Sequence, residues 1–178
     1  MGIGQQQARW YALPVKPGCE ELMVALIRAA AQDEGGLEEC FVPTCDVMVA
    51  PGRDSGFAQQ VLAPLCLVKL KGDADRLLVR MKRTSALRRL AGRGAAFTPL
   101  SAEAAAWVDE NTTPERRSFP MSEGCMENGA VTVTAGPLVG HEDWIGKVSH
   151  RKKRVAVRID MFTPAIDAEM GMRIVGKR

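Results

Sequence analysis

Residues 9–30, with the sequence RWYALPVKPGCEELMVALIRAA, contain two successive patterns that predict the first strand and the first helix of the fold. Aromatic and aliphatic side chains dominate residues 9–15, as is typical of a β-strand. Pro17 and Gly18 interrupt this pattern. Beyond them, one apolar face recurs at helical spacing through Leu22, Ala25, Leu26 and Ala29. The stretch therefore predicts a strand followed by a helix that ends near Gln32.

Two further apolar stretches, 40–49 and 61–70, have the length of β-strands. Pro64 lies in the second stretch and has no N–H to donate to a neighbouring strand, so we expect a bulge or an edge there. Asp73 is a suitable N-cap for a following helix. The apolar side of that helix is predicted to consist of Leu77, Leu78 and Met81.

Ser101 is a suitable cap for a last short helix through Trp107 and Val108. The order of a strand, a helix, two strands and further helices predicts an α+β domain over residues 9–110. Its helices are expected on one face of a small, largely antiparallel sheet. Residues 1–8 are expected to form an N-terminal tail.

The character of the sequence changes beyond residue 110. Residues 111–119 are polar, include Pro114 and show no apolar period, and we expect a linker over 111–128. Short stretches of alternating apolar and polar residues follow, with turn residues between them. Five short strands predict a small SH3-like β-barrel over residues 129–178.

The bulk composition limits the classes of protein to consider. An apolar content of 46% excludes disorder for the chain as a whole, and no apolar run approaches the ~20 residues that span a bilayer. No Lys or Arg precedes Arg9, and no long apolar core follows, so no signal or transit peptide is predicted. We expect a cytoplasmic protein with no membrane partner.

The five cysteines form an odd set with irregular spacing, unlike the disulfide frameworks of small secreted domains. We expect reduced thiols. Cys40 and Cys45 are the only close pair, and the two histidines, His141 and His150, lie about a hundred residues away from them. This separation argues against a zinc site.

No stretch of the sequence matches a catalytic constellation. It contains no Walker-type phosphate loop and no familiar spacing of Ser, His and Asp. His141, Glu142 and Asp143 are adjacent, but on an extended chain such neighbours point alternately to opposite faces. We therefore expect neither enzymatic activity nor a cofactor.

Positive charge is unevenly distributed, although the net charge is only +3. Residues 76–93 contain seven basic residues and no acidic one, and residues 147–158 contain six, again without an acid. Such clusters are either solvated faces or contacts for a polyanion. Arginine pairs with phosphate oxygens through two parallel hydrogen bonds, and each neutralised phosphate releases counterions.

Two parts of the sequence resemble the NusG family of transcription factors. The first part is the opening Trp10-Tyr11-Ala12-Leu13 with Pro17-Gly18-Cys19-Glu20. The second resembles a KOW domain and consists of Gly129-Ala130-Val131-Thr132-Val133, Gly136-Pro137-Leu138-Val139-Gly140-His141-Glu142, Ile145 and Arg151-Lys152-Lys153-Arg154-Val155-Ala156-Val157. The resemblance covers residues 9–178. It implies an N-terminal NGN domain and a C-terminal KOW barrel.

Three details look more like the LoaP branch of specialised antiterminators than like the housekeeping factor. These are the Gly-Pro-Leu-x-Gly-x-Glu block at 136–142, the basic hairpin at 151–156 and the ending Gly171-x-x-Ile174-Val175-x-Lys177. The resemblance implies a non-catalytic factor that binds the clamp of RNA polymerase and a hairpin in the nascent leader RNA. Further implied partners are non-template DNA and, through the KOW domain, a ribosomal protein or a termination factor.

The resemblance assigns candidate residues to both partners. The RNA-binding candidates are Arg76, Arg80, Arg83, Arg88, Arg89, Lys147, Arg151, Lys152, Lys153 and Arg154. The polymerase-binding candidates are Leu65, Cys66 and Val68, which align with the family's contact segment. Here that segment lacks the aromatic residues that many relatives have. Trp144 is the only aromatic residue near the C-terminal basic cluster, where it is either a base-stacking residue or a core residue.

Two alternatives remain open at this point. One is a general NusG-type factor that couples polymerase to the ribosome or to a termination factor without binding a specific RNA. The other is an RNA-binding KOW protein of the ribosome, which would not require the Trp10-Tyr11 domain.

Overall fold

The computed structural model describes residues 7–33, 35–49 and 56–177, so most of the predicted N-terminal tail, residues 1–6, lies outside the described residues. The chain forms two compact units. The first unit consists of residues 1–42 and 64–100, and the second unit consists of residues 43–63 and 101–178. The chain therefore passes from one unit to the other three times.

The first unit is built on a four-stranded sheet with the order β2-β5-β1-β6. β1 pairs antiparallel with β5 and with β6, and β2 pairs antiparallel with the other edge of β5. The strands are β1 (Arg9–Pro14), β2 (Leu37–Phe41), β5 (Leu65–Leu70) and β6 (Thr98–Pro99). The predicted strand over 9–15 is confirmed as β1.

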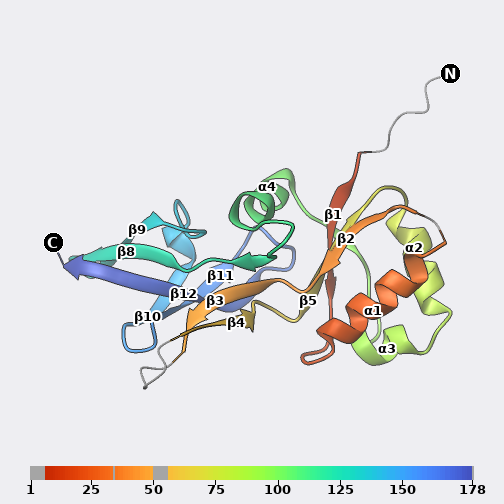
Figure 1. The fold of residues 1–178 in the computed structure, drawn as a ribbon, viewed down its shortest axis with the longest axis horizontal. Coiled ribbons are helices and arrows are strands. Elements are labelled where there is room, and N and C mark those ends of the chain that lie inside the picture. Colours follow the sequence, from red (N-terminus) through yellow and green to blue (C-terminus); the bar gives the residue numbers. More distant parts are fainter. Residues whose placement is uncertain (1–6, 34, 50–55, 178) are drawn as a thin grey trace. The chain divides into compact units, whose positions relative to one another are not determined.

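Three helices lie on one side of this sheet (Figure 1). They are α1 (Glu20–Ala31), α2 (Ala74–Lys82) and α3 (Ala86–Ala91). Their apolar faces form a core with one face of the sheet, to which Leu13, Cys66 and Val68 contribute. Burial of these faces is the main force that holds short helices of this kind in place. The apolar face predicted for α1 is wrong: Met23, Val24 and Ile27 are buried, whereas Leu22 is 62% exposed.

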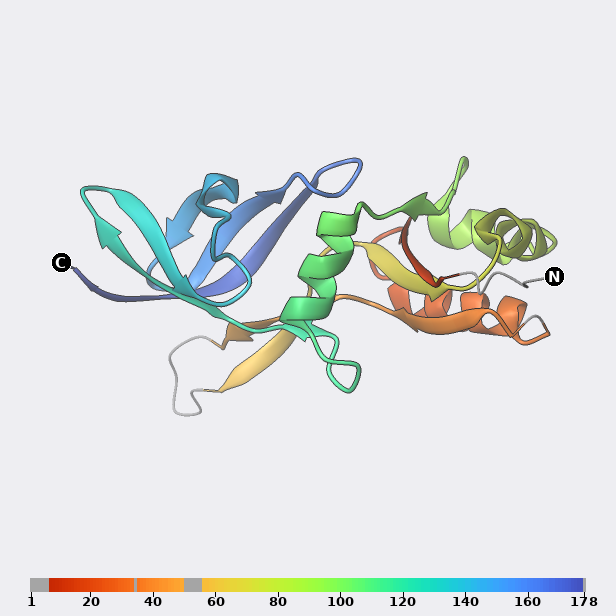
Figure 2. The same cartoon turned by 90° about the horizontal axis from the view of Figure 1, so that it is seen from above.

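The second unit contains a five-stranded sheet with the order β10-β11-β12-β8-β9. It curves into a half-barrel, drawn in teal to blue in Figure 2. Its strands are β8 (Ser122–Glu127), β9 (Ala130–Ala135), β10 (Ile145–Ser149), β11 (Arg154–Ile159) and β12 (Ile166–Lys177), with a short 3₁₀ turn, η1 (Glu142–Trp144), before β10. β12 pairs antiparallel with β11 and parallel with β8.

A second, three-stranded sheet in the same unit has the order β4-β3-β7. It consists of β3 (Thr44–Met48), β4 (Phe57–Val61) and β7 (Ser118–Phe119). Helix α4 (Ala102–Asn111) completes the unit, and the Ser101 side chain accepts a hydrogen bond from the backbone N–H of Ala104 at 3.1 Å. The predicted cap at Ser101 is therefore confirmed.

Both apolar stretches that were expected to be single strands are divided in the structure. Residues 40–49 contain the end of β2 and all of β3, which belong to different sheets and are separated at Val42 and Pro43. Residues 61–70 contain the end of β4 and all of β5, with a bend at Pro64. Pro43 and Pro64 each lie between two strands, where the hydrogen-bonded pairing of a strand ends, because proline has no N–H to donate to a neighbouring strand.

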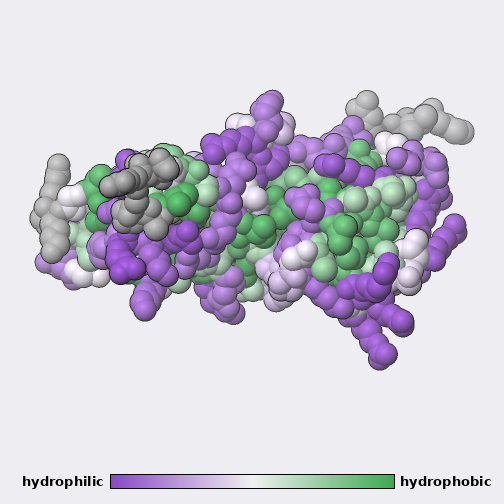
Figure 3. All heavy atoms as spheres, turned by 60° about the horizontal axis from the view of Figure 1, so that its bottom comes forward, coloured by the Kyte–Doolittle hydropathy of each residue, from purple (hydrophilic) through white to green (hydrophobic). Residues whose placement is uncertain are grey.

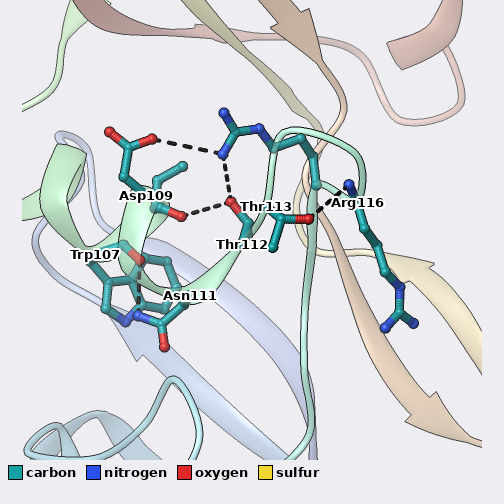
Figure 4. Close-up of polar contacts among 8 residues, drawn as sticks. Trp107, Asp109, Asn111, Thr112, Thr113 and Arg116 are labelled. Atoms are coloured by element: carbon teal, nitrogen blue, oxygen red, sulfur yellow. Dashed lines mark hydrogen bonds and ion pairs between the residues drawn. The ribbon is translucent and has the colours of Figure 1, made fainter.

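The stretch expected to be a linker is folded around the C-terminal end of α4 (Figure 4). The Thr112 hydroxyl donates to the Val108 carbonyl oxygen at 2.7 Å and accepts from the Arg117 guanidinium at 2.8 Å. Asn111 donates to the Trp107 carbonyl oxygen at 2.9 Å. The polar residues of this segment therefore satisfy backbone groups at the helix end. The following residues form β7 and β8.

No helix in residues 7–33, 35–49 and 56–177 has the length and apolarity needed to cross a membrane.

Candidate nucleic-acid interface

Helix α2 presents its arginines on the side away from the core. The Asp73 carboxylate accepts a hydrogen bond from the Asp75 N–H at 2.8 Å, which confirms the predicted N-cap. Leu77, Leu78 and Met81 are buried, as the helical period required. This packing leaves the arginine face of the helix toward solvent.

Arg76, Arg80 and Arg83 line one surface hollow of about 350 Å³ on α2. Their spacing of four and three residues puts them on adjacent turns. Asp73 and Asp75 line the same hollow and reduce its positive charge. Arg80 also has a structural role, because it donates to the Ala30 carbonyl oxygen at 3.2 Å and its side chain is only 29% exposed. The helix therefore contributes a cationic surface that is partly neutralised.

Helix α3 extends this cationic surface. Arg88 and Arg89 are exposed, and Leu87 between α2 and these arginines is buried in the core. In the described part of the chain, Arg83, Arg88 and Arg89 make no side-chain hydrogen bond or ion pair. Their charges are available to an external anion. Figure 3 shows hydrophilic side chains, in purple, that project between apolar patches.

The second cationic surface is the turn between β10 and β11 in the second unit. Strand β11 is anchored by three side chains that are buried at alternate positions, Val155, Val157 and Ile159. At the base of the turn, Ser149 pairs with Arg154 in the β10–β11 ladder. Lys147, Arg151 and Lys152 are exposed, while Lys153 is half-buried with a φ of 53°. We call Lys147, Arg151, Lys152 and Lys153 the basic tip.

Arg154 differs from its neighbours in the basic tip because its guanidinium is already bound within the protein. It donates to the Gln60 amide oxygen and to the Glu169 carboxylate, both at 2.8 Å, and its side chain is 25% exposed. The Gln60 partner could not be identified from the sequence, since it is 94 residues away. RNA binding by Arg154 stays a prediction, and any phosphate would have to displace these partners.

The three candidates for polymerase binding are buried. Leu65 is 6% exposed, and Cys66 and Val68 are completely buried in the core of the first unit. In this structure they have no surface with which to touch a partner. Their assignment to polymerase binding stays a prediction, and they can contribute only by supporting neighbouring surface residues.

Trp144 is a core residue and not a base-stacking residue, the other role that the sequence allows. It is 5% exposed, and its indole N–H donates to the Asp160 carboxylate at 2.8 Å. One face is stacked against the His141 ring at a centroid distance of 3.9 Å. Trp144 is therefore not accessible for base stacking, which leaves phosphate contacts as the chemistry of the basic tip.

The described residues contain no group of three or more His, Cys, Asp or Glu side chains that could hold a metal ion. Cys40 lies in the first unit and Cys45 in the second. Burial raises the pKa of the Cys40 thiol to about 12 and that of Cys45 to about 11, and it raises the pKa of Cys66 further. These thiols remain protonated and unreactive near neutral pH.

We expect the buried thiols to make the protein less stable in alkaline solution. In the unfolded chain they ionise near the ordinary pKa of 9.0, whereas in the folded chain Cys40 and Cys45 ionise only near 12 and 11. The unfolded state therefore binds fewer protons in this interval. The free energy of unfolding should fall from about pH 9 upward, by at most about 1.4 kcal/mol per pH unit for each thiol.

Urea titrations at several pH values between 8 and 11 would measure this slope. The Cys40→Ala variant should show a shallower decline than the parent, because it lacks one of the buried thiols whose pKa is raised. Equal slopes for the parent and Cys40→Ala would contradict the expectation.

Comparison with known proteins finds a similar fold but no similar sequence. No protein-family model and no curated protein sequence matches the chain. Among solved structures, the chain is similar to one described as "Domain interaction in Thermotoga maritima NusG", with a TM-score of 0.51 and 12% sequence identity. The similarity covers 96% of each chain. The protein therefore has a NusG-like mixed α+β fold.

Proposed function

We propose that this protein is a transcription elongation factor of the NusG kind that acts as a processive antiterminator, as in the LoaP branch. It would bind RNA polymerase and a hairpin in the leader RNA, without catalysis or a cofactor. The NusG-like fold over nearly the whole chain supports the general class. The resemblance of the block at 136–142, the basic hairpin at 151–156 and the ending at 171–177 to the LoaP branch supports the particular branch.

The observation that carries the RNA-binding part of the proposal is the availability of cations in both units. Arg83, Arg88 and Arg89 on α2 and α3, and Lys147, Arg151 and Lys152 near the β10–β11 turn, are exposed. None of the six side chains makes a hydrogen bond or ion pair within the described residues. Exposed arginines that stabilise nothing in the fold are suited to phosphate contacts.

In this proposal, residues 9–110 correspond to the NGN domain, 111–128 to the connection and 129–178 to the KOW domain. The polymerase clamp would bind near β5, with Leu65, Cys66 and Val68 beneath the contact surface. Non-template DNA is a further partner in the proposal. A ribosomal protein or a termination factor bound through the KOW domain belongs to the alternative of a general NusG-type factor.

Neutralising either cationic surface should weaken RNA binding. We expect the triple variants Arg83→Gln/Arg88→Gln/Arg89→Gln and Lys147→Gln/Arg151→Gln/Lys152→Gln each to lower affinity for an RNA stem-loop. The slope of log K against log salt should decrease by about 0.7 to 0.9 for each phosphate that the variant no longer neutralises. Fluorescence anisotropy over a series of salt concentrations would measure both quantities.

Arg158→Gln is a matched control, because Arg158 is exposed on β11 but its guanidinium already pairs with Asp167 at 3.0 Å. It should change the slope little. A single-round transcription assay with a terminator downstream of the leader sequence then tests function: the parent should increase read-through and the triple variants should not. RNA binding that is equally strong in all variants would favour the general NusG-type factor.

A further inference from the structure

The contact between β3–β4 and β11–β12 inside the second unit is centred on one cation. Arg154, on β11, holds Gln60 on β4 and Glu169 on β12 through the same guanidinium nitrogen, at 2.8 Å each. Gln60 is opposite Cys45 in the β3–β4 ladder. Arg154 therefore connects the three-stranded sheet to the half-barrel.

Two further contacts complete this connection. The Cys45 thiol donates to the Glu169 carbonyl oxygen at 3.4 Å. Gly171 lies so close to β3 that a Cβ atom there would collide with the Asp46 carbonyl oxygen. We call these residues, Cys45, Asp46, Gln60, Arg154, Glu169 and Gly171, the seam. At the seam, β3 and β12 approach each other so closely that position 171 must be glycine. The charge of Arg154 is paired there with Glu169.

The seam lies directly beside the basic tip. Arg154 follows Lys153 in the chain, and the Lys153 carbonyl oxygen accepts a hydrogen bond from the Met172 N–H, next to Gly171. The four cations of the tip raise the local concentration of anions around Arg154. A phosphate offers the guanidinium two charged oxygens, whereas Gln60 offers one neutral oxygen and Glu169 is 44% exposed to water.

We propose that the seam is a polyanion-sensitive latch: RNA phosphates bound at the basic tip draw Arg154 away from Gln60 and Glu169, and strands β3 and β4 separate from β11 and β12 while β3 stays paired with β7. The latch rests on the proposed function, because it uses the same RNA contact. It gives Arg154 a role different from that of the other cations: they bind the anion, and Arg154 transmits its presence to β3 and β4.

Cys45 is a built-in reporter of the latch. Its side chain is completely buried in the closed seam, and opening would expose it to a maleimide. Cys40 and Cys66 are internal controls, because they are buried in the first unit. Pulsed maleimide labelling of the full chain, followed by peptide mass spectrometry, measures the labelling rate of each cysteine separately.

Opening the seam by mutation should increase the labelling of Cys45 by at least about tenfold, the factor that corresponds to the loss of a single charge-assisted hydrogen bond, whereas Arg154 makes two. We expect this for Arg154→Met, and also for Gly171→Ala, which separates the strands by a different route. Arg158→Met on the same strand should label at the parental rate. Far-UV circular dichroism would confirm that each variant is folded. Parental rates in both seam variants would overturn the latch.

Adding an RNA stem-loop should increase Cys45 labelling in the parent while Cys40 and Cys66 stay protected. It should have no such effect on Lys147→Gln/Arg151→Gln/Lys152→Gln/Lys153→Gln, and potassium chloride at equal ionic strength should not reproduce it. If the parent binds the RNA in anisotropy measurements but Cys45 labelling does not change, the latch is wrong and the proposed function stands. If the parent binds no RNA, the proposed function and the latch both fail.

Discussion

Replacing Trp107 by alanine should destabilise the second unit by about 3–5 kcal/mol. Trp107 is 4% exposed, and its indole N–H donates to the Pro137 carbonyl oxygen at 2.8 Å. Its ring stacks on Phe119 at 4.3 Å and meets the edges or faces of Trp144 and Phe162 at 5.6 and 6.4 Å. The substitution would leave a large cavity and an unsatisfied carbonyl at the centre of this aromatic cluster.

Urea denaturation followed by far-UV circular dichroism would measure the loss, because the midpoint should shift to lower urea. Phe57→Ala is the matched control: this aromatic residue on β4 is 63% exposed, and its removal should cost less than about 0.5 kcal/mol. A loss below about 1 kcal/mol for Trp107→Ala would show that the cluster does not hold the unit together.

Replacing Val68 by aspartate should unfold the first unit or destabilise it by at least about 3 kcal/mol. Val68 is completely buried at the centre of β5, among apolar neighbours from α1 and α2. A carboxylate there has no cation to pair with inside the core cluster, so its desolvation is uncompensated. Thermal unfolding and native-state proteolysis would measure the effect.

Val79→Asp is the control for this substitution, because Val79 on α2 is 56% exposed and a charge there remains in water. Its effect on stability should be small. If Val68→Asp keeps the parental melting temperature, the packing of β5 described above is incorrect. If it unfolds as expected, a loss of polymerase binding in this variant reports unfolding and does not identify a contact.

The local features of the fold were predictable from the sequence. β1 and α2 follow from side-chain patterns within a dozen residues, and the caps at Asp73 and Ser101 follow from a single residue before each helix. The position of α1 also follows, but its predicted apolar face does not, because apolar residues lie on both sides of this helix. These features depend on neighbours in the chain, and the relevant interactions are therefore visible in a short window of sequence.

The features that the sequence did not reveal depend on residues far apart. Pro43 was not recognised as the boundary between two strands, because the apolar stretch continues on both sides of it. Phe119 lies in a polar segment but is completely buried, since β7 pairs with β3. The basic clusters were identified by composition, whereas the engagement of Arg154 with Gln60 was not. Composition shows which residues carry charge and does not show which charges are already paired.

A ribosome making this chain releases the parts of the second unit in an order that delays its assembly. Strands β3 and β4 emerge early, but their partners β7 and β12 are translated many residues later. β12 is also the central strand of the five-stranded sheet, so this sheet cannot close before residues 166–177 have emerged. The segments of the first unit are all available by residue 100. During translation, β3 and β4 must therefore persist as an uncovered pair of strands, and in this interval the chain is most exposed to misassembly.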